Sequence, residues 1–241
     1  MSIIDDMLIL VEDQNEISLQ NAFKKMSKFK KQTISSSLGR LSAKGLIDKY
    51  SRNQEKFYKI NRSGTKLIDK ELEYINYIDP KNIPNEWNMV IFNIPEKLRK
   101  HRDELRRQLV NHGFGRLHDS LWFSKCNLNN QIKEIALTMQ IEKNLLFIKT
   151  TILDQKEEKQ IIAKLYWDWQ KIEKSYNQFC SVCKNFLQKT NKDKFQAKQL
   201  VYQLSKIIKA DPKINEIYYP EGIKKEQAIS YYKKIRPYCY N

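Results

Sequence analysis

A helical pattern followed at once by a hairpin pattern constrains the fold of this chain more than any other feature. Ile34, Leu38 and Leu41 recur at the i, i+4, i+7 spacing that buries one face of a helix, which we expect over 31–44. Gly45 follows at the position where helices often end on a left-handed residue. The sequence therefore predicts a helix with an apolar inner face and a polar outer face.

Two runs of strand-forming residues follow this helix, at 46–50 and 56–60, with a polar turn at 51–54 between them. They predict a two-stranded hairpin with a basic tip. Two further helices are expected earlier in the chain, one on the apolar repeat of residues 3–11 and one after an N-capping Ser18. Helices followed by a basic hairpin are typical of a winged helix-turn-helix, and a small helical bundle with a spare hairpin is the alternative.

Positive charge is concentrated in the same part of the chain. The whole sequence holds 44 Lys and Arg against 28 Asp and Glu, which gives a formal net charge of +16. Between Gln20 and Lys70, fourteen basic residues stand against three acids, and a general lysine bias of the genome would not deplete acids from one segment. Such an excess favours a polyanionic partner, with nucleic acid first and a membrane surface second.

Several features predict a cytoplasmic protein with no membrane partner. No apolar run approaches the roughly 20 residues that a membrane-spanning helix needs. Asp5 and Asp6 stand where an export signal would be basic. The four cysteines form no regular framework, as expected for a reducing compartment.

The residues expected to face DNA share a position on the polar stripe of the helix at 31–44, at its two ends, or at the hairpin tip. Arg40 and Gln32 have the donors and acceptors that read base edges, and the lysines can neutralise phosphates. The candidates are Lys30, Lys31, Gln32, Thr33, Ser36, Arg40, Lys44, Arg52, Asn53, Gln54 and Lys56.

Strand and helix patterns alternate after a hinge at Asp79–Pro84, and this alternation suggests a ferredoxin-like α/β sandwich. The expected strands are 87–94, 116–124 and 144–153, separated by helices at 97–111 and 131–139. Helical patterns alone follow from residue 154. The predicted fold class is therefore α+β, with a winged helix-turn-helix DNA-binding domain at 1–78, a ferredoxin-like dimerisation domain at 86–155 and a helical domain at 156–241 that is a candidate for effector binding.

Residues 87–124 read WNMVIFNIPEKLRKHRDELRRQLVNHGFGRLHDSLWFS, and Trp167-Asp168 and Asp211-Pro212 follow further along. With the winged-helix pattern before it, this order resembles the PaaX family, repressors of phenylacetate-degradation operons, over essentially the whole chain. The resemblance implies a homodimeric repressor on double-stranded DNA that an aryl-acyl-coenzyme A thioester releases from its operator. A homodimer would read an inverted repeat, since one recognition helix makes too few base contacts to find a single site.

The resemblance also implies a central domain similar to the small CRISPR spacer-acquisition nuclease. Asn93 stands where such nucleases carry a metal-binding Asp, and a neutral amide is a poor sole ligand for Mg²⁺. Ile214-Asn215 and Ile223 depart from the Leu-Pro and Trp toward which the family tends, so an effector that touches them can differ from phenylacetyl-coenzyme A. A metal-dependent nuclease, and a DNA-anchored interaction protein without a ligand, are the alternatives to a ligand-responsive repressor.

Other polar clusters favour structural roles, and we expect no metal, no cofactor and no catalytic residue. Cys180 and Cys183 form a lone C-x-x-C without the second pair that a structural zinc site needs. His112, His118 and Asp119 stand near one another around a glycine turn, where hydrogen-bonded structural histidines are commoner than metal ligands.

Two roles remain open for a group of arginines and aromatic residues after the hinge. The arginine-rich helix can contact DNA or the phosphates of a coenzyme A ligand, or it can pair with acids such as Glu96, Asp103 and Glu104 across a dimer. The aromatic side chains can line a pocket or pack in the core. The candidate effector or interface residues are Arg99, Arg102, Arg106, Trp122, Trp167 and Tyr176.

Overall fold

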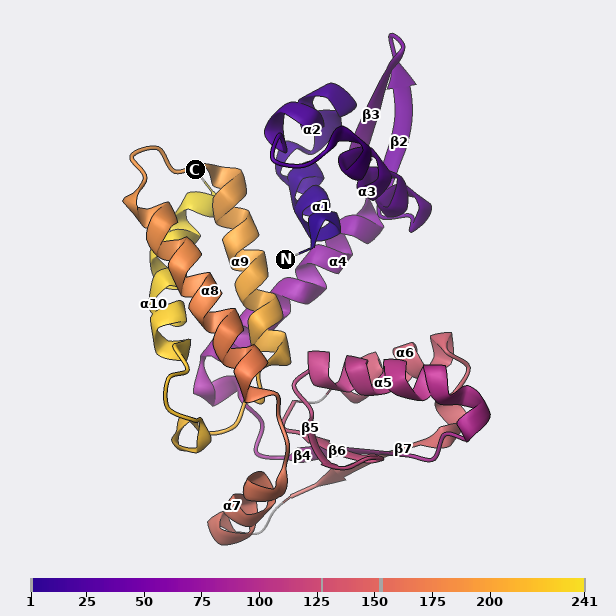
Figure 1. Ribbon diagram of the computed structural model, residues 1–241, viewed down its shortest axis with the longest axis vertical. Helices are drawn as coiled ribbons and strands as arrows, with labels where there is room; N and C mark the ends of the chain where they lie inside the picture. The colour runs from indigo at the N-terminus through magenta and orange to yellow at the C-terminus, as the bar shows by residue number, and fades with distance from the viewer. Residues whose placement is uncertain (1, 127, 152–153, 241) are drawn as a thin grey trace. The chain divides into compact units, whose positions relative to one another are not determined.

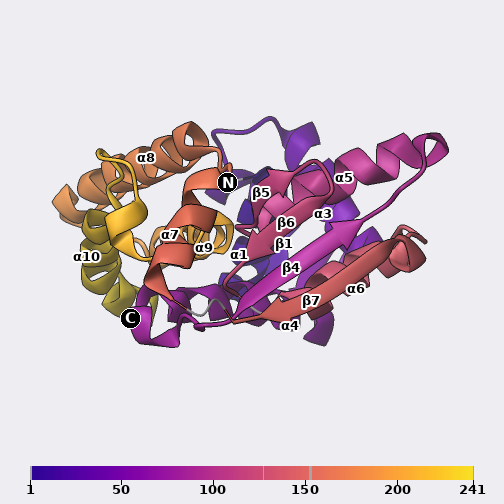
Figure 2. The same ribbon diagram turned by 90° about the horizontal axis from the view of Figure 1, so that it is seen from below.

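The computed structural model describes residues 2–126, 128–151 and 154–240. Helices and two antiparallel sheets make it an α+β chain, as the sequence predicts (Figures 1 and 2). The chain divides into two compact units. The first unit holds Met1–Glu73, Phe179–Ser205 and Glu226–Asn241, and the second holds Tyr74–Gln178 and Lys206–Lys225. The helices after residue 156 therefore contribute to both units.

The first unit begins with the elements expected from the sequence. Ser18 caps the second helix by accepting the N–H of Asn21 at 3.2 Å, and Gly45 adopts the left-handed φ of 65° after the third. A short strand that the sequence pattern did not reveal pairs with the hairpin, so the sheet has three strands in the order β1-β3-β2. The elements are α1 (Ile3–Gln14), β1 (Glu16–Ser18), α2 (Leu19–Lys25), α3 (Lys31–Ala43), β2 (Ile47–Arg52), β3 (Glu55–Ile60) and α4 (Arg62–Leu72).

The hairpin turn is tighter than predicted. The polar run 51–54 was expected to form the whole turn, but β2 and β3 extend into it and leave only Asn53 and Gln54 between them. Both residues have a positive φ, 50° and 64°. Two left-handed residues give a two-residue loop whose twist matches that of the strands. The strands therefore project further than the sequence pattern indicated.

The core of the first unit surrounds α1 on more than one side. Residues 7–11 of α1 are all buried, which a simple amphipathic helix would not allow. Phe195 and Tyr202 of α9 (Lys194–Ala210) belong to the same apolar cluster as α1 and α3. The Lys198 ammonium of α9 lies 3.0 Å from Glu12 and 3.2 Å from Asp13 at the end of α1. A late segment of the chain thus completes the core built by residues 1–73.

Two long helices connect the units along the chain. The division between the units falls inside both α8 (Trp169–Gln188) and α9. In the first unit, Phe186 of α8 packs edge-on against Tyr238, with ring centroids 5.9 Å apart, after α10 (Lys225–Ile235). Each unit therefore contains part of each of these two helices.

The second unit has the element order β-α-β-β-α-β followed by a further helix. Its four strands form one antiparallel sheet in the order β5-β6-β4-β7. The elements are β4 (Trp87–Phe92), α5 (Arg99–Asn111), β5 (Gly115–His118), β6 (Leu121–Ser124), α6 (Asn129–Thr138), β7 (Leu145–Thr150) and α7 (Gln155–Lys164). The expected strand over 144–153 is β7, and positions 152 and 153 of that prediction lie outside the described residues.

The single strand predicted over 116–124 is wrong, because that segment forms the hairpin of β5 and β6. Its turn carries the Asp119 carbonyl, which accepts hydrogen bonds from the Trp122 indole at 3.4 Å and from Arg106 Nη2 at 3.2 Å. Both donors hold the chain in the turn. The Arg106 contact comes from another element, so residues 116–124 alone do not show it.

The two faces of the four-stranded sheet have different coverings (Figure 1). Asn88 of β4 accepts a hydrogen bond from Asn129 of α6 at 3.3 Å, which assigns its face to the helices α5 and α6. Trp87, the preceding residue, points to the opposite face and donates to Glu158 of α7 at 3.2 Å. The short helix α7 therefore covers the Trp87 end of the second face.

Two glycines of the first unit give a matched test of this packing. A Cβ at Gly64, at the start of α4, would collide with the Leu46 carbonyl and the Ile60 side chain, so Gly64→Ala should lower the free energy of unfolding by about 1–3 kcal/mol. Gly39 in α3 has open space around it, and Gly39→Ala should raise the free energy of unfolding by about 0.5–1 kcal/mol. Urea denaturation of both variants checks this. Equal effects of the two substitutions would contradict the packing of the start of α4 against Leu46 and Ile60.

Candidate nucleic-acid interface

The polar face of α3 is open to solvent. Ile34, Leu38 and Leu41 are buried in the core of the first unit. The opposite stripe of α3 is exposed along its length and consists of Gln32, Thr33, Ser36 and Arg40. Within the described residues no ion pair or hydrogen bond engages the Arg40 guanidinium. This side chain is therefore available to an external acceptor such as guanine.

The N-terminus of α3 has no side-chain cap. Lys30 occupies the N-cap without a side-chain hydrogen bond to the first turn, and Lys30 and Lys31 are both exposed. Unpaired N–H groups and the helix dipole make such an end attractive to anions, and two ammonium groups add to that field. The start of α3 therefore has the chemistry of a phosphate contact. In the sequence, only the two lysines pointed to this contact.

The hairpin tip presents its polar residues to solvent, and one of them is held in place. Arg52 of β2 lies 3.1 Å from Glu16 of β1, and its guanidinium stacks 4.3 Å from the Phe57 ring centroid. The Tyr50 hydroxyl donates to the other oxygen of Glu16. Glu16 thus orients a residue of the tip, a role that the sequence did not suggest because β1 is only three residues long.

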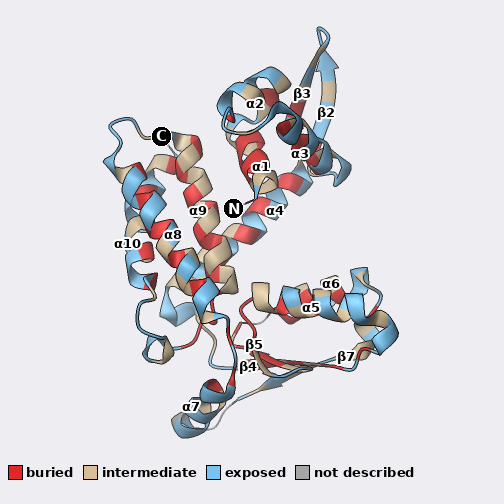
Figure 3. Ribbon diagram, in the orientation of Figure 1, coloured by how far each residue is buried: buried red, intermediate tan, exposed pale blue. Residues whose placement is uncertain are grey.

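All eleven candidate DNA-facing residues are exposed and belong to the first unit. They lie on two elements, α3 with its flanking residues and the β2–β3 hairpin. The pale blue of the β2–β3 hairpin in Figure 3 marks much of it as exposed. The exposed set is Lys30, Lys31, Gln32, Thr33, Ser36, Arg40, Lys44, Arg52, Asn53, Gln54 and Lys56. These residues therefore all belong to α3, its flanking residues or the β2–β3 hairpin.

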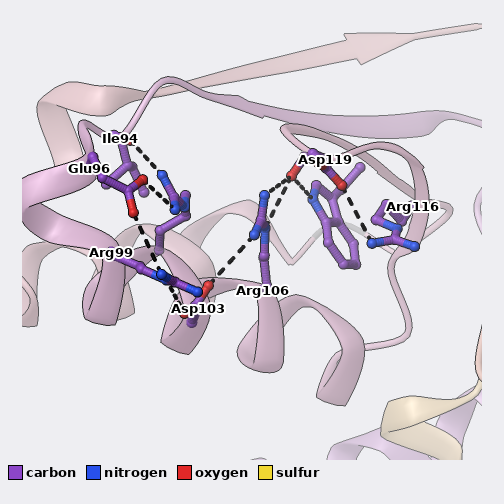
Figure 4. A network of polar contacts seen from close by, with 9 residues as sticks. Ile94, Glu96, Arg99, Asp103, Arg106, Arg116 and Asp119 are labelled. Carbon is purple, nitrogen blue, oxygen red and sulfur yellow. Dashed lines mark hydrogen bonds and ion pairs between the residues drawn. The ribbon is translucent and has the colours of Figure 1, made fainter.

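The arginines of α5 belong to a separate network in the second unit (Figure 4). Arg102 Nη2 lies 2.8 Å from Glu96, and this bond is the main reason why the pKa of Glu96 lies below its usual value. Arg99 approaches Glu96 at 3.9 Å and Asp103 at 3.8 Å, and Arg106 approaches Asp103 at 3.6 Å. The acids that the sequence offered as partners across a dimer here pair with arginines of the same chain.

The three aromatic candidates are core residues. Trp122, Trp167 and Tyr176 are all buried. Trp122 donates to the Asp119 carbonyl and Trp167 to the Gly113 carbonyl, both at 3.4 Å. The sequence left open whether these aromatic side chains line a pocket or pack in the core, and their burial corresponds to core packing.

A buried charge cluster around Asp211 was not found from the sequence. The Asp211 carboxylate accepts hydrogen bonds from the hydroxyls of Tyr176, at 2.6 Å, and Tyr219, and Lys225 Nζ lies 3.5 Å away. Burial would raise the pKa of Asp211, but Lys225 and Lys213 outweigh burial, so its pKa is lowered. In the sequence, the Asp-Pro pair at 211–212 served only as part of the resemblance to the PaaX family. The cluster ties α8 to the segment after α9 within the second unit.

Asn93 stands where the related nucleases carry a metal-binding Asp. Asn93 is exposed, and its backbone N–H and carbonyl pair with Asn144 at 3.0 and 2.8 Å. Across the described residues, no group of three or more His, Cys, Asp or Glu side chains is arranged to hold a metal ion. Cys180 and Cys183 are buried, and burial raises the pKa of Cys183 to about 12.

Comparison with known proteins identifies the second unit. Residues 80–162 match the family model described as the PaaX protein central Cas2-like domain. The chain carries a PaaX-family central domain. The resemblance to the PaaX family is therefore confirmed over this segment, which contains all four strands of the second sheet together with α5 and α6.

The other comparisons are less informative than the PaaX match. The uncharacterized protein Rv0674 from Mycobacterium tuberculosis is 12% identical, with a TM-score of 0.48, and the alignment covers 88% of this chain and 82% of that one. No curated protein matches the chain. Within the described residues, no helix is both long and apolar enough to cross a membrane.

Proposed function

We propose that this chain is a DNA-binding transcriptional repressor of the PaaX type that acts in the cytoplasm on double-stranded DNA. The observation that carries the proposal is the exposed polar face of α3, with an unpaired Arg40, beside a basic hairpin. In this reading α2 and α3 form the helix-turn-helix, α3 enters the major groove and the β2–β3 hairpin is the wing. The PaaX match of the second unit supports the same class of protein.

The proposed DNA contacts divide into two kinds. The lysines at both ends of α3 and in the hairpin neutralise phosphates and supply affinity without sequence preference. Gln32 and Arg40 read bases, since their side chains match the acceptor and donor edges of adenine and guanine in the major groove. Arg52, fixed by Glu16 and Phe57, serves the wing, where a preset side chain loses less freedom on binding.

The second unit is proposed to be a ferredoxin-like dimerisation domain. Its β-α-β-β-α-β order and its strand order β5-β6-β4-β7 support this assignment. The strand registers group apolar residues on the face opposite α5 and α6, and only the Trp87 end of that face has a covering helix. Met89 and Ile148 on this face are partly exposed and form the proposed contact, and Phe123 beside them is buried within the chain. Ile91, Leu121 and Leu146 lie beyond them, toward the carboxyl end of β4 and outside the proposed contact. An apolar sheet face of this kind suits a second copy of the chain.

A small-molecule effector, an acyl-coenzyme A or a related compound, is proposed to release the repressor from its operator. Helix α8 begins in the second unit and α9 ends there. A ligand that favours one arrangement of the second unit can therefore act on the DNA-binding unit through these two helices. A nuclease activity is disfavoured because Asn93 cannot supply the negative charge that metal-assisted phosphodiester cleavage needs.

Substitution of Arg40 tests base recognition. On a duplex selected in vitro from random sequences, Arg40→Ala should weaken binding by about 1–3 kcal/mol, because a bidentate contact to guanine is lost. The loss should fall on one base-pair position in fluorescence-anisotropy titrations of single-base variants. Lys66→Ala, an exposed change on α4, is the control and should leave affinity and specificity unchanged.

Salt dependence in the same titrations provides a second criterion. A plot of the logarithm of the binding constant against the logarithm of the salt concentration should have a slope of about −0.9 for each phosphate contacted. A flat response to salt would contradict the proposed phosphate contacts, and equal weakening by Arg40→Ala on every sequence would contradict base reading by α3.

The oligomeric state tests the proposed dimer face. Light scattering on the full chain should give a dimer, and Ile148→Glu should give a monomer, because a buried unpaired carboxylate opposes association. Leu137→Glu on α6 is the control, since Leu137 is 58% exposed on the other side of the sheet. A monomeric wild type, or a dimer that persists in Ile148→Glu, would refute the sheet-face interface.

A further inference from the structure

A groove lies at the carboxyl end of β4 in the second unit, away from the Trp87 end that α7 covers. Its volume is about 690 Å³, within the roughly 300–1,000 Å³ of typical small-ligand sites. Arg102, Arg106 and Lys143 line it together with Ser120. These cationic and polar groups come from α5, the β5–β6 turn and the segment before β7, so three separate elements converge on one space.

The cations around the groove exceed the carboxylates that neutralise them. Glu96 and Asp103 are shared among Arg99, Arg102 and Arg106 (Figure 4). Lys143 is exposed, and no ion pair engages it in the part of the chain that the structure describes. Two carboxylates therefore face four cationic side chains, and the remaining positive charge favours an anion.

The guanidinium of Arg102 has an unused donor. Its Nη2 bonds to Glu96 at 2.8 Å and its Nη1 donates to the Ile94 carbonyl at 3.4 Å. The Nε–H is buried and has no acceptor within the described residues. Buried donors are rarely left unsatisfied. An oxyanion in the place of Glu96, whose side chain is 70% exposed, would bond Nε and Nη2 together in the bidentate geometry that arginine prefers.

The other wall of the groove is apolar. Ile91, Leu145 and Leu146 line it, and Leu146 is 57% exposed. A ligand that consisted of phosphate alone would leave this surface in water, whereas an organic group would cover it and gain affinity from burial. The two walls together define the ligand as an anion with an apolar portion.

We propose that the groove binds a small organic anion, with its phosphate or carboxylate on Arg102, Arg106 and Lys143 and its apolar part on Ile91 and Leu146. As an effector site the groove rests on the proposed repressor function, but binding of the anion itself does not. The ligand class follows from the walls: oxygen atoms that accept from guanidinium and ammonium groups, joined to an aromatic or aliphatic body.

Calorimetric titration of the full chain tests the proposal with four probes. Naphthyl phosphate or naphthoate should bind at one site per chain, and the stronger of the two identifies the head group. Inorganic phosphate lacks the apolar body and naphthol lacks the charge, so each should bind at least roughly tenfold more weakly than the stronger anion. Equal binding of inorganic phosphate would refute the role of the apolar wall, and equal binding of naphthol would refute the role of the cations.

Variants on the groove locate the site. Lys143→Gln removes an exposed ammonium and should weaken the stronger anion roughly tenfold without affecting the fold. Arg106→Gln should have a similar effect, but Arg106 also holds the Asp119 turn, so its thermal unfolding is measured alongside. Arg107→Gln is the control, because Arg107 lies on the same helix and pairs with Glu104 outside the groove. Absence of binding, or binding that Lys143→Gln leaves unchanged, would overturn the proposal.

DNA titrations of the same proteins separate this inference from the proposed function. Lys143→Gln should still bind DNA without the ligand, and Arg40→Ala should still bind the anion. A wild-type chain that binds the anion but not DNA would refute the repressor and leave the groove intact. A chain that binds DNA but none of the four probes would refute the groove alone.

Discussion

Burial of α1 on several sides is the constraint on which the DNA-binding unit depends. Residues 7–11 are apolar and buried throughout, and α3 packs against α1 with its Ile34, Leu38 and Leu41 face. That contact determines which side of α3 remains in water. Phe195 and Tyr202 of α9 close the same core. A fragment that ended near residue 78 would expose this apolar surface, so the N-terminal domain is incomplete without a segment from the end of the chain.

Local features were predictable from the sequence, whereas contacts between distant segments were not. The apolar spacing of α3 and the glycine at position 45 identified the helix and its end, because both signals lie within a few residues. The strand β1 was missed, since three residues are too few to show alternation. The β5–β6 hairpin was read as one strand because the side chain that fixes its turn, Arg106, is on another element.

The same distinction applies to the candidate sites. Solvent exposure of the α3 stripe follows from helical periodicity, so those residues could be named in advance. Glu16 and the Asp211 cluster could not, because each joins residues that are far apart in sequence. The α5 arginines were recognised as a group, but their pairing with Glu96 and Asp103 reduces the charge that they can offer to DNA. The open positive charge of α3 and the hairpin therefore carries the proposed interface.

Acetylation footprinting of lysines tests most directly the claim that α3 and the hairpin form the DNA-binding surface. The full chain is acetylated with and without a duplex of mixed sequence at low ionic strength, and each lysine is read by mass spectrometry. We expect slower modification of Lys30, Lys31, Lys44 and Lys56 in the complex, because phosphates cover their ammonium groups. Exposed lysines of the second unit, such as Lys100 and Lys159, should react at unchanged rates. Protection confined to Lys100 and its neighbours on α5, with α3 and the hairpin unaffected, would show that DNA binds elsewhere and contradict the proposed interface.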